Sequence, residues 1–515
     1  MSSRDLPRSF TSWYKRFPDE ITLNKKTVEE TEDEKAVRKV QMKNLWPAFI
    51  SGAGLFSDGY VNNSIGTVTT CLSLLYKEKY THSNAISNIA AIAFAGTVIG
   101  QLSFGYISDH YARKGGMLVA NVALIFFALL CAVATWGKTP EGTFAAVTTC
   151  RFFLGIAIGA EYPTSSVIAS EFANQLPSGH RNRYFCWFTN SCIDLGFVIS
   201  SFVPLVLLWI FSERHLTVVW RLTLALGAIP PISLFFMRRK MTNSEAYEKL
   251  NMKTVTNFPF WLTIKFYWFR LIVVSIIWFI YDFSAYSFSL YSSYILSVIL
   301  PDSDIYKSWG WNVVFNLFYI PGTFLGGYCT DFFGPRLTLA VGLTCQAIVG
   351  FGMTAGYSHL KHHIAAFVVV FGIFTTLGEF GPGNNVGILA AKTSATPIRG
   401  QYYGIAAATG KVGAFVGTYI FPIILRRYKG DKGIQTAFYI SSALCLFSAI
   451  LTVFFVPSVD QEAINKEDVA YVNYLKSHGF DISNMGNGTV SEYVESESTE
   501  FDQKRSEAKV DTYSV

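Results

Sequence analysis

Twelve long apolar stretches follow one another along the chain, separated by polar connectors. Most of them approach the roughly 20 consecutive apolar residues that an α-helix needs to cross the hydrocarbon core of a bilayer. The pattern therefore predicts an all-α integral membrane protein with twelve transmembrane helices. Their approximate ranges are 46–67, 86–108, 115–136, 143–170, 184–210, 217–237, 268–298, 309–330, 336–356, 364–390, 400–425 and 435–456.

Two of the connectors share a sequence pattern. They read Gly105-Tyr-Ile-Ser-Asp109-His-Tyr-Ala-Arg113 and Gly327-Tyr-Cys-Thr-Asp331-Phe-Phe-Gly-Pro-Arg336. The second follows the first by 222 residues in a chain of 515. A repeat at this offset indicates a duplicated membrane unit, which predicts two six-helix lobes with a substrate site between them. We expect the acids and arginines of these connectors to form salt bridges between the lobes in one conformation and to release them in another. A plain charged turn is the alternative.

The polar stretches divide the chain into five predicted parts. Basic residues gather in connectors that lie on one side of the membrane, which places both termini in the cytosol by the positive-inside rule. One late connector, around residues 426–432, disagrees. The C-terminal part is rich in Ser, Thr and Glu and is predicted to be disordered and open to kinases or ubiquitin ligases. The parts are 1–44 (N-terminal tail), 45–237 (first lobe), 238–265 (cytosolic linker), 266–456 (second lobe) and 457–515 (C-terminal tail).

Composition supports a membrane protein and excludes several other classes. Hydrophobic residues make up 51% of the chain and charged residues 15%, and the formal net charge is only +6. That charge gives no reason to expect nucleic acid as a partner. The eight cysteines form no Cys-x-x-Cys pair or metal-ligand cluster, so neither a metal nor another cofactor is expected. No nucleophile elbow or phosphate-cradling glycine loop is present, which argues against an enzyme.

Several ionisable side chains lie deep inside apolar stretches. Each costs several kcal/mol at the centre of a bilayer, so such groups face the bundle interior or have a function. Asp58 and Asp282 occupy similar places in the two halves, and position 383, beside Asn384, matches Glu161 after the 222-residue offset. This pairing across the halves predicts a shared central cavity. The deep ionisable residues are Asp58, Arg151, Glu161, Asp194, Asp282, Glu379 and Lys411.

One predicted cation, Lys411, therefore faces several carboxylates. An anion can bind beside Lys411 and neutral amide or phenol donors if protons neutralise the acids, because burial and a second negative charge both raise the pKa of a carboxyl group. Proton binding and anion binding then favour each other, which is proton–anion symport. A fixed structural ion pair between Lys411 and one acid is the alternative. Arg151 is expected to brace its helix, with a carboxylate as partner, as a conformational rather than a substrate residue.

The connectors resemble the signature of the major facilitator superfamily, and three helix motifs are similar to those of fungal phosphate:proton symporters. The Gly-Ala-Glu-Tyr-Pro and Gly-Pro-Gly-Asn-Asn forms and a later Arg-Gly-Gln-Tyr-Tyr segment look most like the fungal glycerophosphodiester permeases. The resemblance covers roughly residues 45–456. The motifs are Arg151-Phe-Phe-Leu-Gly-Ile-Ala-Ile-Gly-Ala-Glu161-Tyr162-Pro, Trp278-x-x-x-Asp282-x-x-x-Tyr286, Gly381-Pro-Gly-Asn384-Asn385, Arg399-Gly-Gln-Tyr-Tyr403 and Gly404-Ile-Ala-Ala-Ala-Thr-Gly-Lys411.

The resemblance implies proton-coupled uptake of glycerophosphoinositol or glycerophosphocholine by a monomeric, multi-pass protein of the plasma membrane. It implies that the phosphoryl group is bordered by Tyr162, Trp278, Asp282, Tyr286 and Lys411, to which the amide of Asn384 is added as a donor. Asp58, Glu161 and Asp282 are the proton-coupling candidates. Two other functions remain open: an inorganic phosphate:proton symporter, and a nutrient receptor that signals without transport.

Overall fold

The computed structural model describes residues 38–255, 257–299, 305–428, 431–497 and 499. Most of the predicted N-terminal tail therefore lies outside the described residues, as does the end of the C-terminal tail. The described part is helical throughout and contains no strand. Its twelve long helical segments form two lobes of six, as the apolar pattern predicted.

Interrupted helices are frequent in the first lobe. Three of its six segments consist of two helices in line, joined by a short turn. The segments are α4 (Leu45–Gly52) with α5 (Phe56–Tyr76), α7 (Ala85–His110), α8 (Arg113–Val133), α9 (Pro140–Glu161) with α10 (Val167–Asn174), α11 (Arg181–Phe211), and α12 (Leu216–Leu226) with α13 (Ile229–Arg238). The short helix α6 (Glu78–Thr81) follows α5, and α14 (Glu245–Leu250) lies in the linker between the lobes.

The second lobe repeats this arrangement, with two interrupted segments. Its segments are α15 (Phe260–Ile299), α16 (Ile305–Leu317) with α17 (Tyr319–Phe333), α18 (Pro335–Ala355), α20 (Ile364–Gly378) with α21 (Asn384–Lys392), α22 (Arg399–Arg427) and α23 (Asp431–Phe455), with the short α19 (Tyr357–Leu360) after α18. Ten of the twelve described segments are long and apolar enough to cross a membrane. The segments that contain α5 and α17 do not reach that threshold, yet both pack inside the bundle.

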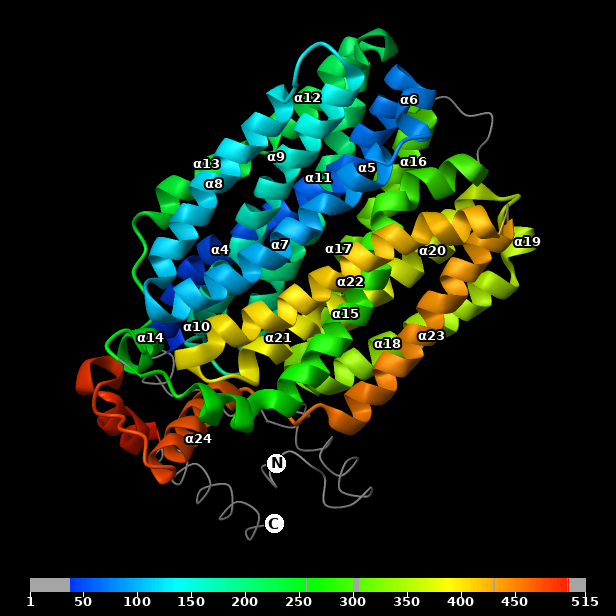
Figure 1. The fold of residues 1–515 in the computed structure, drawn as a ribbon. Helices are drawn as coiled ribbons and strands as arrows, with labels where there is room; N and C mark the ends of the chain where they lie inside the picture. Colours follow the sequence, from blue (N-terminus) through cyan, green and yellow to red (C-terminus); the bar gives the residue numbers. More distant parts are fainter. Residues whose placement is uncertain (1–37, 256, 300–304, 429–430, 498, 500–515) are drawn as a thin grey trace.

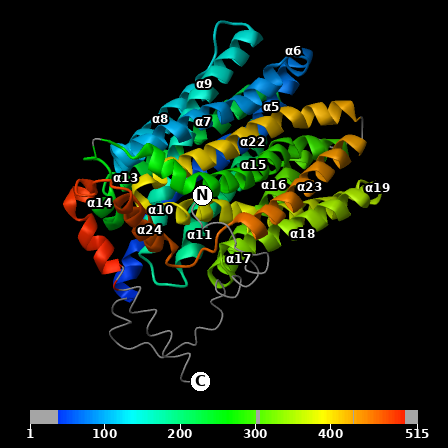
Figure 2. The ribbon, with the colours of Figure 1, turned by 60° about the horizontal axis from the view of Figure 1, so that its bottom comes forward.

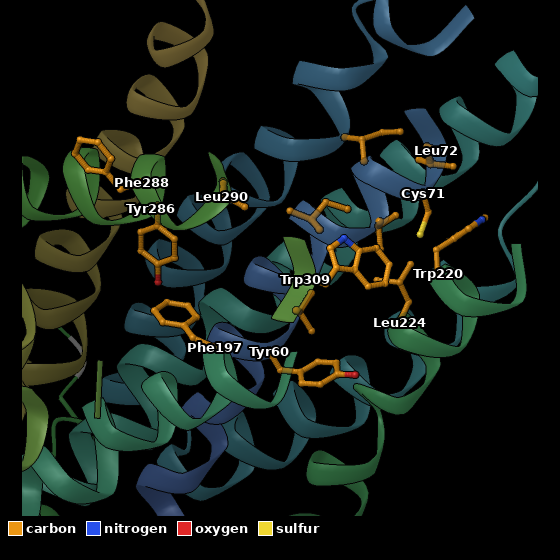
Figure 3. Packing of buried hydrophobic residues seen from close by; sticks show 14 of the residues in the cluster. Tyr60, Cys71, Leu72, Phe197, Trp220, Leu224, Tyr286, Phe288, Leu290 and Trp309 are labelled. Carbon is orange, nitrogen blue, oxygen red and sulfur yellow. The ribbon is translucent and has the colours of Figure 1, made fainter. Parts of the chain in front are cut away.

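The two lobes meet along a small set of helices. Helices α7 and α22 lie side by side at the interface, as do α5 with α15 and α11 with α17. Figure 1 shows α8, α9 and α12 on one side of this interface and α18, α20 and α23 on the other. Figure 3 shows part of the apolar core near the interface, where Phe197 of the first lobe and Tyr286 of the second lie close together.

Glycine pairs bring helices α7 and α9 into close contact inside the first lobe. Gly96 and Gly100 on α7 face Gly155 and Gly159 on α9, each pair spaced as Gly-x-x-x-Gly. A Cβ atom at Gly155 would lie 2.1 Å from the carbonyl oxygen of Ala93, and one at Gly100 would lie 2.1 Å from that of Ile156. Helices in lipid use such small residues to pack backbone against backbone. These glycines therefore fix the position of α9, which carries Glu161 at its end.

Both lobes carry a π-helical turn beside the interface. The turn Tyr162–Ser166 joins α9 to α10, and the turn Glu379–Gly383 joins α20 to α21. Each contains a proline, Pro163 or Pro382, which removes a backbone donor from the helix ladder. Such turns concentrate at functional sites because they redirect side chains within a helix. Here they direct Tyr162 and Asn384 towards the interface between the lobes.

The predicted disorder of the C-terminal tail is wrong for much of its described part. Residues Ala463–Ser477 form helix α24, whose apolar side chains Ile464, Tyr471, Val472 and Leu475 are buried. Their spacing is that of one face of a helix, so this part of the tail carries a helical periodicity in its sequence. Figures 1 and 2 show α24 at one end of the bundle, where it contacts α21. The helix is held there by contacts with both lobes.

The predicted linker 238–265 also needs correction at its two ends. Arg238 is the last residue of α13 and is fully buried, rather than part of a solvated basic connector. The other end of the predicted linker, from Phe260 onwards, already belongs to α15. Between them, α14 begins after Ser244, whose hydroxyl caps the helix by accepting a hydrogen bond from the backbone N–H of Tyr247.

Candidate functional site

A cavity of about 50 Å³ lies between the two lobes near the middle of the bundle. Side chains from α11 and from the π-helical turn after α9 line it on the first-lobe side. Side chains from α15, α21 and α22 line it on the other side. Its lining residues include Tyr162, Asn190, Asp194, Trp278, Asp282 and Tyr286.

Lys411 of α22 sits beside the cavity in a compact charged cluster. Its ammonium nitrogen lies 3.3 Å from a carboxylate oxygen of Asp58 and 3.5 Å from one of Asp282. It also donates to the hydroxyl of Tyr286 and lies 3.8 Å from the centre of that ring. All three charged side chains are at most 2% exposed. The cluster therefore holds two carboxylates against one cation.

Neutral donors complete this cluster. The hydroxyl of Tyr286 donates to Asp58 at 2.6 Å, and the amide of Asn62 donates to the other oxygen of Asp58 at 2.6 Å. The hydroxyl of Tyr162 also donates to Asp58. Asp58 and Tyr162 come from the first lobe, whereas Lys411 and Tyr286 come from the second. The cluster thus joins the lobes across the cavity.

The structure brings together most of the predicted site residues. Five of the six predicted substrate-binding residues line the cavity, and the sixth, Lys411, contacts two of them. The five are Tyr162, Trp278, Asp282, Tyr286 and Asn384. The amide of Asn384 donates to the carbonyl oxygen of Thr323 at 2.9 Å, and its own oxygen accepts from Asn190 at 3.4 Å.

Glu161, one of the predicted proton-coupling residues, lies outside this cluster. It pairs with Arg238, whose guanidinium nitrogen lies 2.7 Å from a carboxylate oxygen of Glu161. The hydroxyl of Ser165 donates to the second oxygen. Arg238 also donates to the carbonyl oxygens of Ser51 at 2.7 Å and Ile50 at 3.3 Å. Arg238 could not be recognised as this partner from its sequence context, because it stands next to two further basic residues after an apolar stretch.

Arg151 braces its helix through backbone oxygens rather than through the carboxylate that was expected. Its Nε donates to the carbonyl oxygen of Ile89 at 2.8 Å, and a second nitrogen contacts that of Val61 at 3.5 Å. The residue is fully buried. It therefore ties α9 to α7 and α5 within the first lobe.

The repeated connectors join the lobes at one end of the bundle, here called the motif end because it carries Asp109 and Asp331. Asp109 accepts hydrogen bonds from the backbone N–H groups of Gly400 at 2.9 Å and Gln401 at 2.7 Å, which belong to the other lobe. Arg183 of the first lobe lies 3.3 Å from a carboxylate oxygen of Asp331. The Arg183–Asp331 pair is a salt bridge between the lobes, whereas Asp109 reaches the other lobe through backbone hydrogen bonds.

The arginines of the connectors have different roles. Arg113 lies 3.2 Å from Asp109 in its own lobe and also donates to the carbonyl oxygen of Thr396 in the other lobe at 2.6 Å. Glu171 contacts Arg113 and lies 3.3 Å from Arg399, so it links the lobes as well. Arg336 donates to the carbonyl oxygen of Val456 at 3.3 Å, within the second lobe.

Polar side chains also join the lobes on the opposite side of the cavity. Asn63 of α5 accepts from Ser289 of α15 at 2.8 Å and lies 3.3 Å from Asn316 of α16. Nearer the end of the bundle, the hydroxyl of Tyr419 donates to Asn88 at 2.7 Å. The lobes are therefore in contact on both sides of the cavity, which is the arrangement of an occluded carrier.

Two further acids of this region were noted in the sequence but given no role. Asp194 of α11 lines the cavity, and Glu379 lies on the π-helical turn beside it. They are 1% and 2% exposed, respectively. Within the described residues, no Lys, Arg or His nitrogen comes within 4.0 Å of either carboxylate. The sequence signal for both residues was an acid deep inside an apolar stretch, with no predicted cation at the matching position of the other half.

Comparison with known proteins places the chain among transporters. The family model for "Sugar (and other) transporter" matches residues 47–253 and 238–471. A glycerophosphocholine permease of Candida albicans is 61% identical over 512 residues, covering 96% of each chain. A major glycerophosphoinositol permease of the same species is 59% identical over 535 residues, covering 100% of both chains. A glycerophosphoinositol transporter of Saccharomyces cerevisiae is 34% identical, covering 86% of this chain and 85% of its own length.

Solved structures agree on the fold. The proton:xylose symporter XylE bound to 6-bromo-6-deoxy-D-glucose superimposes with a TM-score of 0.68 over 83% of this chain and 99% of its own, at 16% sequence identity. This confirms the predicted two-lobe architecture, and the relatives confirm that the protein is a transporter rather than an enzyme. The chain is a member of the sugar (and other) transporter family within the major facilitator superfamily, alongside the fungal glycerophosphodiester permeases.

Proposed function

We propose that this protein carries glycerophosphodiesters, such as glycerophosphocholine or glycerophosphoinositol, across the plasma membrane by alternating access. The observation that carries the proposal is a lysine beside the central cavity, Lys411, in a chain about 60% identical to permeases named for these substrates. A phosphodiester bears one permanent negative charge. One ammonium group and several neutral donors therefore suffice to hold it.

The phosphoryl group takes a place beside Lys411. Tyr162 and Tyr286 present phenol groups there, and both now donate to Asp58. An incoming phosphodiester oxygen can accept from these donors and from the ammonium group only when they are released from the carboxylates. Trp278 and Asn384 line the same cavity, where they bound the space for the two substituents of the diester.

Proton coupling follows from the charges of the cluster. Lys411 already faces Asp58 and Asp282, so an anion entering beside it meets two negative charges and one positive charge. Protonation of one acid removes that excess and frees donors for the substrate, which makes proton and anion binding mutually favourable. Asp58 and Asp282 are therefore the favoured proton-coupling residues. The role of Glu161 in coupling stays a prediction, since its carboxylate contacts Arg238 and Ser165 instead.

The remaining features of the proposal concern the setting of the protein. Both termini lie in the cytosol, so the motif end is the cytosolic end, and the protein acts as a monomer. Its inter-lobe contacts at Asp109 and Asp331 then form a cytosolic gate. The C-terminal part beyond α24 is a substrate for kinases or ubiquitin ligases, because it continues in Ser, Thr and Glu.

Uptake measurements test the proposal directly. Cells that express the protein as their only candidate carrier receive labelled glycerophosphocholine or glycerophosphoinositol at two pH values, with and without excess inorganic phosphate. We expect uptake of at least one diester, stimulated at the lower pH and resistant to phosphate. Strong phosphate uptake without diester uptake would refute the proposal in favour of a phosphate symporter.

Inorganic phosphate transporters are represented among the relatives at lower identity. A probable inorganic phosphate transporter of Arabidopsis thaliana is 24% identical over 508 residues, which covers 84% of this chain. A signalling receptor that does not transport is the other alternative. The predicted disorder of the C-terminal tail does not count against a receptor, because α24 gives part of the tail a defined structure. The uptake experiment decides here too, because a receptor predicts no accumulation of either diester.

A further inference from the structure

Asp194 and Glu379 form a second charged feature of the cavity, separate from the Lys411 cluster. Asp194 belongs to α11 of the first lobe, and Glu379 belongs to the π-helical turn of the second. Asn190 bridges them, because its amide donates to Glu379 at 2.9 Å from one turn before Asp194 on the same helix. We refer to Asp194 and Glu379 as the acid pair.

Not every carboxylate oxygen of the acid pair accepts a hydrogen bond. Glu379 accepts from Tyr281 at 2.8 Å and from Asn190, while one oxygen of Asp194 accepts from the hydroxyl of Thr323. The other oxygen of Asp194, Oδ1, is buried and has no hydrogen-bond partner among the described residues. A buried carboxylate oxygen without a partner costs several kcal/mol unless a ligand satisfies it. Because Asp194 lines the cavity, that oxygen is available to whatever the cavity holds.

The backbone leaves room for Glu379 at the cavity wall. Gly383, which lines the cavity, lies one turn after Glu379. A Cβ atom at Gly383 would lie 2.1 Å from a carboxylate oxygen of Glu379 and 2.8 Å from the hydroxyl of Tyr281. Any residue other than glycine would therefore displace the carboxylate. The absence of a side chain at Gly383 lets Glu379 sit directly behind the cavity surface.

Aromatic rings surround the same space. The cavity is lined by Phe185, Phe197, Trp278, Tyr281 and Tyr286. Phe197 and Tyr286 meet edge to face with ring centres 6.3 Å apart, one from each lobe (Figure 3). Negative charge combined with aromatic faces is the environment that binds a quaternary ammonium group, which has no hydrogen to donate and is attracted to carboxylates and π-faces.

We propose that the acid pair is a head-group subsite that binds the cationic, methylated ammonium of a zwitterionic phosphodiester. The inference rests on the proposed function and adds to it a second anchoring point. The phosphoryl group then occupies the Lys411 side of the cavity, and the ammonium group lies against the acid pair and offsets part of its negative charge. A neutral polyol head group, such as inositol, would occupy the same space without that charge interaction.

A pair of isosteric ligands tests the subsite without altering the protein. Glycerophosphocholine and its analogue with a 3,3-dimethylbutyl group in place of choline share their shape, but only the former carries the ammonium charge. Each is used to inhibit uptake of labelled glycerophosphoinositol by the unmodified transporter. We expect the uncharged analogue to inhibit about tenfold more weakly, the equivalent of about 1.4 kcal/mol. Equal inhibition by the two would overturn the subsite.

Variants provide an independent measurement. Asp194→Asn keeps the shape of the side chain, and we expect it to raise the KM for glycerophosphocholine about tenfold more than the KM for glycerophosphoinositol. The same substitution at Asp431, which pairs with Lys361 at 2.5 Å and is 43% exposed, is the matched control. An equal rise of both KM values would contradict a head-group role. Failure of the unmodified protein to carry either diester is a different result, which refutes the proposed function itself.

Discussion

Replacement of Arg238 by Met removes one partner of a fully buried ion pair. The guanidinium group lies 2.7 Å from a carboxylate oxygen of Glu161, and the two side chains are 0% and 2% exposed. Met has a similar length and fills much of the same space. The substitution therefore keeps most of the packing, while it removes the charge of Arg238 and its hydrogen bonds to the carbonyl oxygens of Ser51 and Ile50.

The expected cost is large because water cannot replace the lost partner. Removal of one member of a buried ion pair typically destabilises a protein by about 3–5 kcal/mol. Ser165 remains as a donor to the carboxylate, which offsets part of this cost. An exposed pair is worth only about 0–1 kcal/mol. Lys361→Met, which breaks the partly exposed pair with Asp431, is therefore the matched control.

Thermal unfolding of the purified proteins in detergent measures the difference. We expect Arg238→Met to lower the melting temperature strongly and Lys361→Met to change it little. The double variant Glu161→Gln with Arg238→Met should regain at least half of the lost stability, since it leaves no uncompensated buried charge. A single variant as stable as the parent, or a double variant no better than the single one, would refute the structural role of the pair.

Three shorter predictions follow from other contacts. Lys411→Ala should abolish diester uptake without loss of protein from the membrane, measured by uptake and surface labelling; near-normal uptake would exclude it as the anion partner. Arg183→Gln, which removes the ion pair with Asp331, should increase labelling of an engineered cysteine at the motif end, and unchanged labelling would contradict a gate there. Burial raises the pKa of Asp468 on α24 to about 6, although Arg399 and donors from Thr396 oppose the rise. The equilibrium constant for docking of α24 should therefore fall on the order of 100-fold as pH rises from about 4 to above 6. A protease-protection assay measures this change, and Asp468→Asn should not show it.

Much of the cavity could be predicted because charge is rare inside apolar helices. Asp58, Asp282 and Lys411 stood out against their surroundings, and the duplication placed two of them at matching positions in the lobes. In the structure, the ammonium nitrogen of Lys411 lies within 3.5 Å of a carboxylate oxygen of each of the two acids. The members of the cluster could therefore be predicted from the sequence, since only a shared interior could accommodate such groups.

Pairings between distant segments could not be predicted in the same way. Arg238 resembled a solvated linker residue, because its neighbours in sequence are basic, yet the fold turns it back towards Glu161. Asp331 was expected to form a salt bridge between the lobes, and its partner at 3.3 Å is Arg183, which lies outside both connector motifs. A charge motif indicates that a contact exists. Which partner is reached depends on the packing of helices that are far apart in the sequence.

The division of the Lys411 cluster between the lobes bears directly on the transport cycle. Asp282 and Lys411 belong to the same lobe, so their contact survives any rigid movement of one lobe against the other. Asp58 belongs to the other lobe, and its contact with Lys411 at 3.3 Å must break when the cavity opens. The separated Asp58 then needs a proton or a new partner, while Lys411 gains a vacant side for the phosphodiester. Opening, proton uptake and substrate binding are therefore linked through one ion pair.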